Sequence, residues 1–209
     1  MLITEAHNFN GVQWGKDKRY LRNNFTPASQ IASLFWDYYE FTGDEEFLKE
    51  RAYTFMKKAS HFYLDRLEWD EEKNEYFLKA SLYESAPIAY VKNPISDRNC
   101  IERLFKDCIR AAEILNVDKD EVKQWRHVLN HLWERGYQQF GECGEVISPA
   151  EEYYTEKRYS PWIWGNGGAV AFPAGLIGID DKDTRLGKAV VNLLNCLLYT
   201  SPSPRDRTR

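Results

Sequence analysis

Two segments near the start of the chain carry hydrophobic residues at the spacing of an α-helix. In the first, residues 27–42, Pro27 fits the opening turn because its missing N–H is not needed there, and Thr26 is the candidate cap. Gly43 follows the segment, as a glycine often does beyond a helix C-terminus. Five large side chains recur every three or four positions and define the expected buried face: Ile31, Leu34, Phe35, Tyr38 and Phe41.

A second helical segment, residues 45–67, follows after a short turn. Asp44 is placed to cap it, and Glu45 and Glu46 favour the positive end of its dipole. Two helices joined by so short a turn predict an antiparallel helical hairpin. One face of this second helix is expected to be buried: Leu48, Ala52, Phe55, Ala59 and Phe62.

The same pattern returns further along the chain and predicts a second hairpin. Its helices are expected over 95–116 and 118–136, and Asp118 and Glu121 have the spacing of a capping box at the start of the latter. A last helix is expected from about Asp183. The buried face of the longest helix is predicted to hold six residues: Ile101, Leu104, Phe105, Cys108, Ala112 and Leu115.

Long connections separate these helices. Residues 68–93 read as extended, and residues 136–168 are irregular and rich in glycine and aromatic residues. Stacked helical repeats have short connections at a fixed period, which does not fit this chain. Loops longer than about 15 residues in a compact domain are usually functional. The pattern therefore predicts an all-α fold whose hairpins form part of a toroid, with the long loops gathered on one face around a pocket.

Composition narrows the class of protein. The formal net charge of −4 gives no electrostatic case for a nucleic-acid partner. No apolar run approaches the roughly 20 residues that cross a bilayer, so no membrane partner is expected. The first residues lack the basic and apolar regions of a signal peptide, which leaves both a cytoplasmic and a secreted location open. The sequence does not indicate an oligomeric state.

Neither metal nor cofactor is indicated by the residue spacing. The cysteines Cys100, Cys108, Cys143 and Cys196 form no CxxC pair, so we predict free buried thiols rather than a zinc site or a disulfide framework. No His, Asp or Glu cluster has the spacing of metal ligands. We expect no cofactor.

The final residues change character, becoming basic and rich in Pro and Ser. From Cys196 to Asp206 they match, codon by codon, the translation of a transposase adapter used in DNA sequencing. We therefore predict that the natural sequence ends near Asn195 and that residues 196–209 are an adapter-derived tail, to be excluded from reasoning about the fold. On this interpretation residues 1–195 are a fragment of a larger domain.

The segment "SLYESAP", residues 81–87, holds one carboxylate, Glu84, beside Tyr83. One interpretation is a solvated loop acid. The other is a general acid, which must remain protonated near neutral pH, and a segment without cations favours that state. Hydrolysis of a glycosidic bond needs such a proton at the leaving oxygen.

A second candidate segment is "PWIWGNGG", residues 161–168. Trp162 and Trp164 could stack on the apolar face of a sugar, and Asn166 could hydrogen-bond two hydroxyls. Packing of the two tryptophans in the core is the alternative. Fraying at the chain end is the simpler interpretation of His7 and Asn8, and the alternative is that both reach the pocket.

Other polar residues have a plainer explanation. A second carboxylate could come from Glu151, Glu152 or Glu156, but all three can equally be solvated charges. Three histidines lie in the expected helices and are assigned structural roles: His61, His127 and His131.

Several segments together resemble the catalytic domain of family 95 glycoside hydrolases: residues 24–67, "SLYESAP", residues 95–120 and residues 166–181. The resemblance implies an (α/α)-six barrel and an inverting hydrolase of carbohydrate, similar to α-L-fucosidases. It implies that Glu84 is the general acid and that Tyr83 lies beside the substrate. The family's asparagine segment, which holds the attacking water, would lie before Met1, so residues 1–195 alone are expected to be inactive.

A different class of function remains open, a non-catalytic helical scaffold that binds protein or glycan. An enzyme should gather Glu84, the 161–168 segment and the 136–160 loop on one face of the molecule. A scaffold has no such requirement, so the placement of these loops discriminates between the two.

Overall fold

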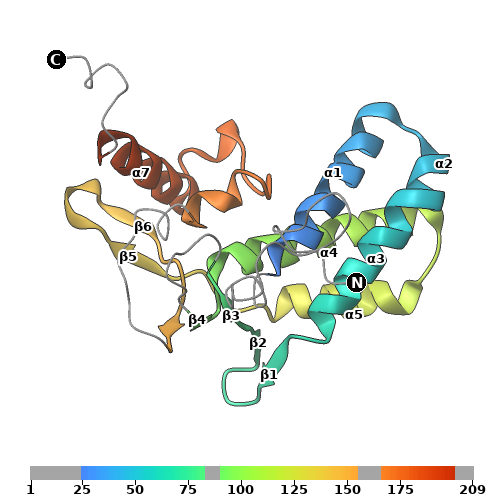
Figure 1. Cartoon of the computed structure of the whole chain (residues 1–209), viewed down its shortest axis with the longest axis horizontal. Coiled ribbons are helices and arrows are strands. Elements are labelled where there is room, and N and C mark those ends of the chain that lie inside the picture. The colour runs from blue at the N-terminus through green and yellow to red at the C-terminus, as the bar shows by residue number, and fades with distance from the viewer. Residues whose placement is uncertain (1–24, 83–89, 155–165, 201–209) are drawn as a thin grey trace, which may run out of the picture.

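The computed structural model describes residues 25–82, 90–154 and 166–200, and its first half is built from helical hairpins (Figure 1). The first hairpin joins α1 to a continuous helical run whose middle turn is a π-helix, and the second joins α4 to α5. The helices have these bounds: α1 Thr26–Thr42, α2 Glu45–Phe47, η2 Leu48–Ala52, α3 Tyr53–Leu64, α4 Ile95–Leu115, α5 Lys119–Asn130 and α7 Arg185–Thr200.

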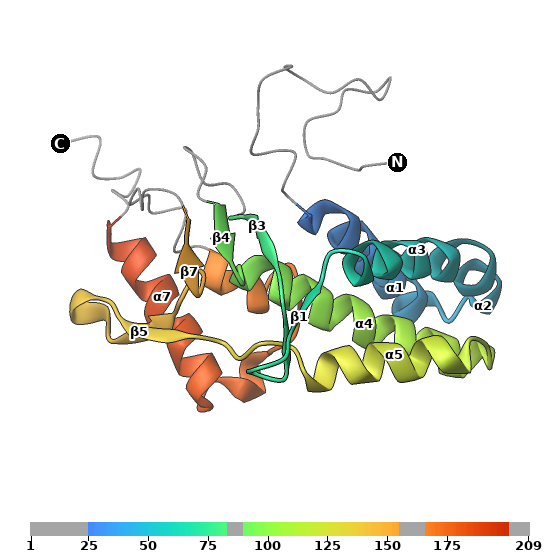
Figure 2. The same ribbon diagram turned by 90° about the horizontal axis from the view of Figure 1, so that it is seen from below.

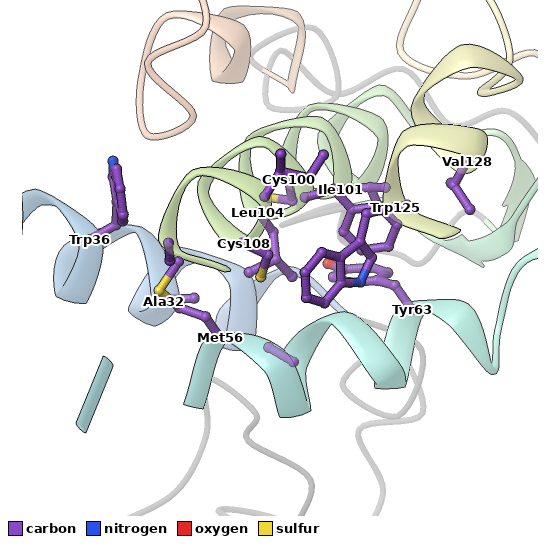
Figure 3. Packing of buried hydrophobic residues seen from close by; sticks show 14 of the residues in the cluster. Ala32, Trp36, Met56, Tyr63, Cys100, Ile101, Leu104, Cys108, Trp125 and Val128 are labelled. Atoms are coloured by element: carbon purple, nitrogen blue, oxygen red, sulfur yellow. The ribbon is translucent and has the colours of Figure 1, made fainter. Parts of the chain in front are cut away.

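Helix α4 is the centre of the helical part. It packs against α1 and α3 on one side and against α5 on the other, as the edge-on view shows (Figure 2). The side chains between these helices form one continuous core, of which Figure 3 shows a part. Fully burying one large apolar side chain contributes about 1.5–3 kcal/mol, so this core is the main stabilising element. Its labelled members include Trp36, Met56, Tyr63, Ile101, Leu104, Cys108, Trp125 and Val128.

The predicted face of α4 is confirmed, with Leu115 half-buried. The predicted face of the second helix is confirmed at Leu48, Ala52 and Ala59, whereas Phe55 and Phe62 are half-buried.

The predicted face of α1 is wrong. Leu34 and Phe41 are 66% and 92% exposed, and Tyr38 is also exposed. Helix α1 instead turns a face of small residues with one tryptophan toward α3 and α4. Small side chains let helices approach closely, so the face with the largest hydrophobic residues is not the one that packs. The buried residues of α1 are Thr26, Pro27, Ser29, Ala32, Ser33 and Trp36.

The turn between α1 and α2 has the geometry expected from its sequence. Gly43 adopts a left-handed conformation with φ of 66°, and its N–H donates to the carbonyl of Tyr39. Asp44 caps the next helix, accepting the N–H of Phe47 at 2.8 Å. Thr26, by contrast, is already the first residue of α1 and is not its cap.

The predicted capping box at Asp118 is also absent. Asp118 has a positive φ of 51° and makes no side-chain bond to its own helix. Its carboxylate instead accepts the Tyr53 hydroxyl at 2.7 Å and pairs with the Lys57 ammonium at 2.9 Å. The residue therefore joins the two hairpins, because a tertiary contact has replaced the local one.

Three small antiparallel sheets occupy the connections, where extended chain was predicted over residues 68–93 and irregular structure over residues 136–168. Helix α5 ends at Asn130, earlier than expected, because β5 begins a few residues later. The sheets are β1 with β2, β3 with β4 and β7, and β5 with β6. Their bounds are β1 Glu68–Asp70, β2 Glu75–Phe77, β3 Lys79–Ser81, β4 Tyr90–Lys92, β5 Tyr137–Gln139, β6 Glu145–Ile147 and β7 Glu152–Tyr153.

Helix α7 lies apart from the hairpins and packs on β6 and on the 3-10 helix η4, Asn166–Val170 (Figure 1). A second, smaller core forms here, and Ile95 at the start of α4 belongs to it. Within the described residues, no helix is both long and apolar enough to cross a membrane.

The cysteine prediction is half correct. Cys100 and Cys108 are free and buried, as expected. Cys143 and Cys196, however, form a disulfide, with their Cα atoms 5.6 Å apart. The 3-10 helix η3, Gly141–Cys143, packs against α7, so the two sulfurs meet although they are 53 residues apart in sequence. Helix α7 continues past Asn195 to Thr200, and the tail boundary remains a prediction.

Candidate functional site

The sheet formed by β3, β4 and β7 borders two segments that carry candidate residues: the first, residues 83–89, holds Glu84, and the second, residues 155–165, holds Trp162 and Trp164. Residues 83–89 connect β3 to β4, and residues 155–165 follow β7. Strand β7 runs antiparallel to β4, with Val91 opposite Tyr153 and Lys92 opposite Glu152. The last residue before the second segment, Tyr154, donates its N–H to the carbonyl of Tyr90 at 3.0 Å. Both segments therefore leave from the same end of one sheet.

The aromatic rings at this end are in contact. The Tyr90 and Tyr154 ring centroids lie 5.8 Å apart, where each strand meets its segment. Tyr83 and Glu84, in the first segment, and Trp162 and Trp164, in the second, lie outside the described residues, as do His7 and Asn8. Their grouping around one site stays a prediction. The residues that border the two segments, Tyr90 and Tyr154, lie side by side.

Asn93 and Glu151 fasten the opposite end of the sheet. Asn93 has a positive φ of 57°, and its Oδ1 accepts the N–H of Leu78 at 2.9 Å. Its Nδ2 donates to Glu151 at 2.5 Å, and Glu151 also pairs with Lys73 at 2.7 Å. These bonds connect the residue before β3, the residue after β4 and the residue before β7. They therefore hold the sheet at the end away from residues 83–89 and 155–165.

Glu151 is therefore a structural carboxylate. Its partial burial favours the neutral form, but hydrogen bonds from Lys73 and Asn93, together with the charge of Lys92, keep its pKa below the usual value. A group held ionised in this way does not act as a proton donor near neutral pH. Glu152 lies in β7 and is exposed, and Glu156 lies outside the described residues. Glu151 thus has structural partners, and a role for any of the three acids as a second carboxylate stays a prediction.

The second segment is followed by the 3-10 helix η4, which contains Gly167 and Gly168 and packs on α4 and α7. Asn166 opens η4, which packs on α4. A side chain at Gly167 would meet the Leu193 Cδ2 atom at 2.8 Å, so the absence of a side chain at this position favours the close approach of η4 to α7. The segment 155–165 is consequently tied at one end to β7 and at the other to the first part of α4.

A buried polar cluster lies where α1 and α4 begin. The Tyr63 hydroxyl, from α3, donates to the carbonyl of Phe25 at 3.0 Å and lies 3.4 Å from the Ser29 hydroxyl. Ser29 in turn donates to the carbonyl of Thr26 at 2.7 Å. These bonds fix the first turn of α1, directly after the segment that carries His7 and Asn8.

Asp97 completes this cluster from α4, and the sequence analysis did not find it. Its side chain is buried, with 1% of the residue exposed. Oδ2 accepts the Ser96 hydroxyl at 3.2 Å, whereas Oδ1 has no hydrogen-bond partner among the described residues. Burial raises the pKa of Asp97 to about 7, against which the bonds from Ser96 and from its own N–H act only in part. The sequence around it, "NPISDRNC", is polar and gave no signal that this acid would be buried.

The histidines have the structural surroundings expected of them. His61 hydrogen-bonds Glu121 at 2.9 Å, which joins α3 to α5. His127 lies in α5, and His131 follows its last residue rather than lying within it. Both rings pack against Trp69 of β1. Within the described ranges, no three or more His, Cys, Asp or Glu side chains are grouped so that they could hold a metal ion.

A groove of about 660 Å³ between α4, α5 and the end of α1 has little free charge. Arg103 bonds to Asp37 and Asp107, Arg110 pairs with Glu40, and Arg126 pairs with Glu113. Since these cations already have carboxylate partners, the groove is a weaker candidate than the sheet end.

Helical hairpins with two long segments rooted at the same end of one sheet fit the class of helical glycoside hydrolases. The chain belongs to family 95 of these enzymes: residues 3–195 match the family described as Glycosyl hydrolase family 95 catalytic domain. It is also similar to a protein-glucosylgalactosylhydroxylysine glucosidase of Dictyostelium discoideum. That protein is 24% identical over 135 residues, which cover 59% of this chain and 18% of the relative. The chain therefore spans less than a fifth of this relative's length.

Proposed function

We propose that the protein hydrolyses the O-glycosidic bonds of oligosaccharides or glycans, with inversion and with α-L-fucosides as substrates. In this proposal the described hairpins are part of an (α/α)-six barrel, Glu84 is the general acid, and Tyr83, Trp162, Trp164 and Asn166 contact the sugar. The observation that carries the proposal is the pairing of β4 with β7, which roots the two candidate segments at one end of a single sheet.

The chemistry follows from the groups that each segment supplies. A carboxylic acid at the leaving oxygen donates a proton as the glycosidic bond breaks, and a water molecule attacks from the opposite face of the ring. An indole face packs against the C–H groups of the sugar and so orients the bond. His7 and Asn8 precede α1, whose first turn the Tyr63 bonds hold in place, and they are proposed to line the same pocket.

A glucoside is the second candidate substrate. The similar protein from Dictyostelium discoideum is a glucosidase by name. A panel of aryl glycosides that differ only in the sugar therefore decides the specificity, and the sugar with the highest kcat/KM identifies it. The rival class, a helical scaffold that binds glycan without cleaving it, predicts binding without turnover of any member of the panel.

The decisive test of Glu84 is Glu84→Gln in the protein as its gene encodes it. Glutamine keeps the shape but carries no transferable proton, and general acid catalysis contributes about 10² to 10⁴ in rate. We expect kcat/KM to fall by that factor on a natural glycan, whose leaving group is poor. An aryl glycoside with an activated leaving group should lose far less, because it needs little protonation.

The matched control is Glu152→Gln, since Glu152 is an exposed carboxylate in the strand beside the second segment. It should keep near wild-type rates on both substrates. Equal, small losses on both substrates for Glu84→Gln would mean that the proton donor lies elsewhere.

A further inference from the structure

We propose that a cavity at the end of the sheet held by Asn93 and Glu151 is a second carbohydrate site, which binds one neutral sugar unit. The cavity has a volume of about 340 Å³. This lies at the lower end of the range for ligand pockets, about 300–1,000 Å³, and fits one ring rather than several. The inference rests on the proposed function only in taking a carbohydrate as the partner.

The cavity is separate from the two candidate segments. Residues 83–89 and 155–165 border the sheet at the end marked by Tyr90 and Tyr154, whereas Asn93 and Glu151 line the cavity at the other end. Strand β4, Tyr90–Lys92, spans the distance between the two ends. Three residues of strand cover about 10 Å, so a sugar in the cavity does not occupy the position proposed for bond cleavage.

The walls of the cavity are held in place by bonds within the chain. Glu151 accepts hydrogen bonds from Lys73 at 2.7 Å and from Asn93 at 2.5 Å, which joins the β1–β2 hairpin to the sheet. On the opposite wall, the N–H of Ser148 donates to the carbonyl of Gly136 at 2.9 Å. A site whose walls are already fixed loses less entropy when a ligand binds.

Three polar side chains that line the cavity have no hydrogen-bond or ion-pair partner among the described residues: Trp133, Glu134 and Ser148. The indole N–H can only donate, the carboxylate can only accept, and the hydroxyl can do both. Sugar hydroxyls donate and accept as well. A polyhydroxyl ring can therefore satisfy all three groups, whereas a ligand with donors alone or acceptors alone cannot.

The charged groups of the cavity favour a neutral ligand. Lys73 is paired with Glu151 at 2.7 Å and Arg135 with Glu102 at 2.6 Å, so neither cation is available to an anion. A sugar acid or a phosphate would also be repelled by the unpaired carboxylate of Glu134. An amino sugar would in turn meet the positive charges of Lys73 and Arg135, which line the same cavity.

Gly136 leaves space beside the free hydroxyl of Ser148. A Cβ atom at position 136 would lie 3.1 Å from the Ser148 Cβ and 3.3 Å from its Oγ. The φ angle of Gly136 is not in the left-handed region, so alanine is compatible with the backbone there. Gly136→Ala is therefore a small obstruction placed next to one of the three binding groups.

The test is fluorine NMR of the protein as its gene encodes it, labelled with fluorotryptophan and titrated with methyl glycosides. Trp133→Phe identifies the Trp133 signal by its loss. We expect this signal to shift in a saturable way with at least one neutral sugar, from methyl fucoside, glucoside and galactoside. Methyl glucuronide, an anion, and methyl glucosaminide, a cation, should bind more weakly than that sugar.

Three variants test the binding groups directly. Glu134→Ala and Ser148→Ala each remove one hydrogen-bonding group and should weaken binding by about 3- to 10-fold. Gly136→Ala should also weaken it. The matched control is Glu142→Ala, because Glu142 is an exposed carboxylate of η3 that does not line the cavity. Its affinity should equal that of the wild type.

Turnover of aryl glycosides by the wild type, measured in parallel, separates the two proposals. If no glycoside is turned over but the Trp133 signal shifts and the variants weaken binding, the glycosidase proposal fails and the carbohydrate site stands. The inference is wrong if no neutral sugar shifts the Trp133 signal, or if a charged sugar binds as tightly. It is equally wrong if Glu134→Ala and Ser148→Ala keep the wild-type affinity, whatever the turnover.

Discussion

The helical hairpins and the three-stranded sheet of β3, β4 and β7 are built on different principles. The hairpins are held together by side-chain packing, because α4 is buried against α1, α3 and α5 through a continuous apolar core (Figure 3). In the sheet, short runs of backbone hydrogen bonds are fastened by two polar side chains, Asn93 and Glu151. Substitutions can therefore destabilise the helical core and the sheet separately, because the core depends on side-chain packing and the sheet on a few directed hydrogen bonds.

Truncation of a core side chain should lower the free energy of unfolding more than any other change proposed here. Phe105 is fully buried on α4, so Phe105→Ala removes a large side chain that its neighbours cannot replace. We expect a loss of about 3–5 kcal/mol in the free energy of unfolding. Phe41→Ala on the exposed side of α1 is the control, and urea denaturation should show a change within about 0.5 kcal/mol. A similar loss for both variants would show that the exposed face of α1 is also packed in solution.

Asp97 lies near the start of α4, where the helical hairpins follow the sheet, and it should make the stability of the protein depend on pH. Asp97 keeps its proton in the folded chain up to about pH 7, whereas its ordinary value is 3.8. Between these values the unfolded chain binds fewer protons than the folded chain, so stability falls as the pH rises. The whole fall amounts to at most about 4 kcal/mol. Chemical denaturation at a series of pH values should show this slope in the wild type and lose it in Asp97→Asn.

The approach of η4 to α7 should be sensitive to a single methyl group. Gly167→Ala would place a carbon 2.8 Å from the Leu193 side chain, and the Ile147 backbone and side chain close the other side. Overpacking of this kind costs about 1–3 kcal/mol. Gly178→Ala is the control, because no atom lies within 4 Å of the added carbon. Equal thermal midpoints for the two variants would contradict the close approach.

The smallest expected effect is at the turn of the first hairpin. Asp44→Ala removes the side chain that accepts the Phe47 N–H. Losing an N-cap costs about 0.5–2 kcal/mol. Asp44→Asn should restore most of it, because an amide oxygen can accept the same bond. Calorimetry on the three proteins measures the difference, and an Asn variant no better than Ala would mean that the charge, rather than the bond, stabilises the helix.

The sequence predicted the helices well because their period is a local property. The hairpins, the Gly43 turn, the Asp44 cap and the face of α4 follow from residue spacing alone. The face of α1 was predicted wrongly because hydropathy favours Leu34 and Phe41, while close helix packing selects the small residues. Which neighbours surround a helix is a tertiary property that spacing does not contain.

The candidate site was predictable only as a list of residues. Nothing in "SLYESAP" shows that the strand after it pairs with Glu152 and Tyr153, far along the chain, because two residue pairs of sheet give no periodic signal. Asp97 was missed for a related reason, since its burial depends on α1 and α3 covering α4. Likewise, only the packing of η3 on α7 brings Cys143 and Cys196 together.

The π-helix η2, Leu48–Ala52, gives the first hairpin a tolerance that α4 does not have. A π-turn holds one residue more than the same stretch of α-helix, so removing that residue restores regular winding without rotating the rest of the helix. Lys49, Glu50 and Arg51 are exposed, so any of them can be the residue removed. A one-residue deletion here keeps Met56 and Tyr63 facing the core, whereas the same deletion in α4 would rotate the rest of that helix by about 100°. The helix should therefore tolerate the loss of one residue at η2 without a change in which side chains face the core.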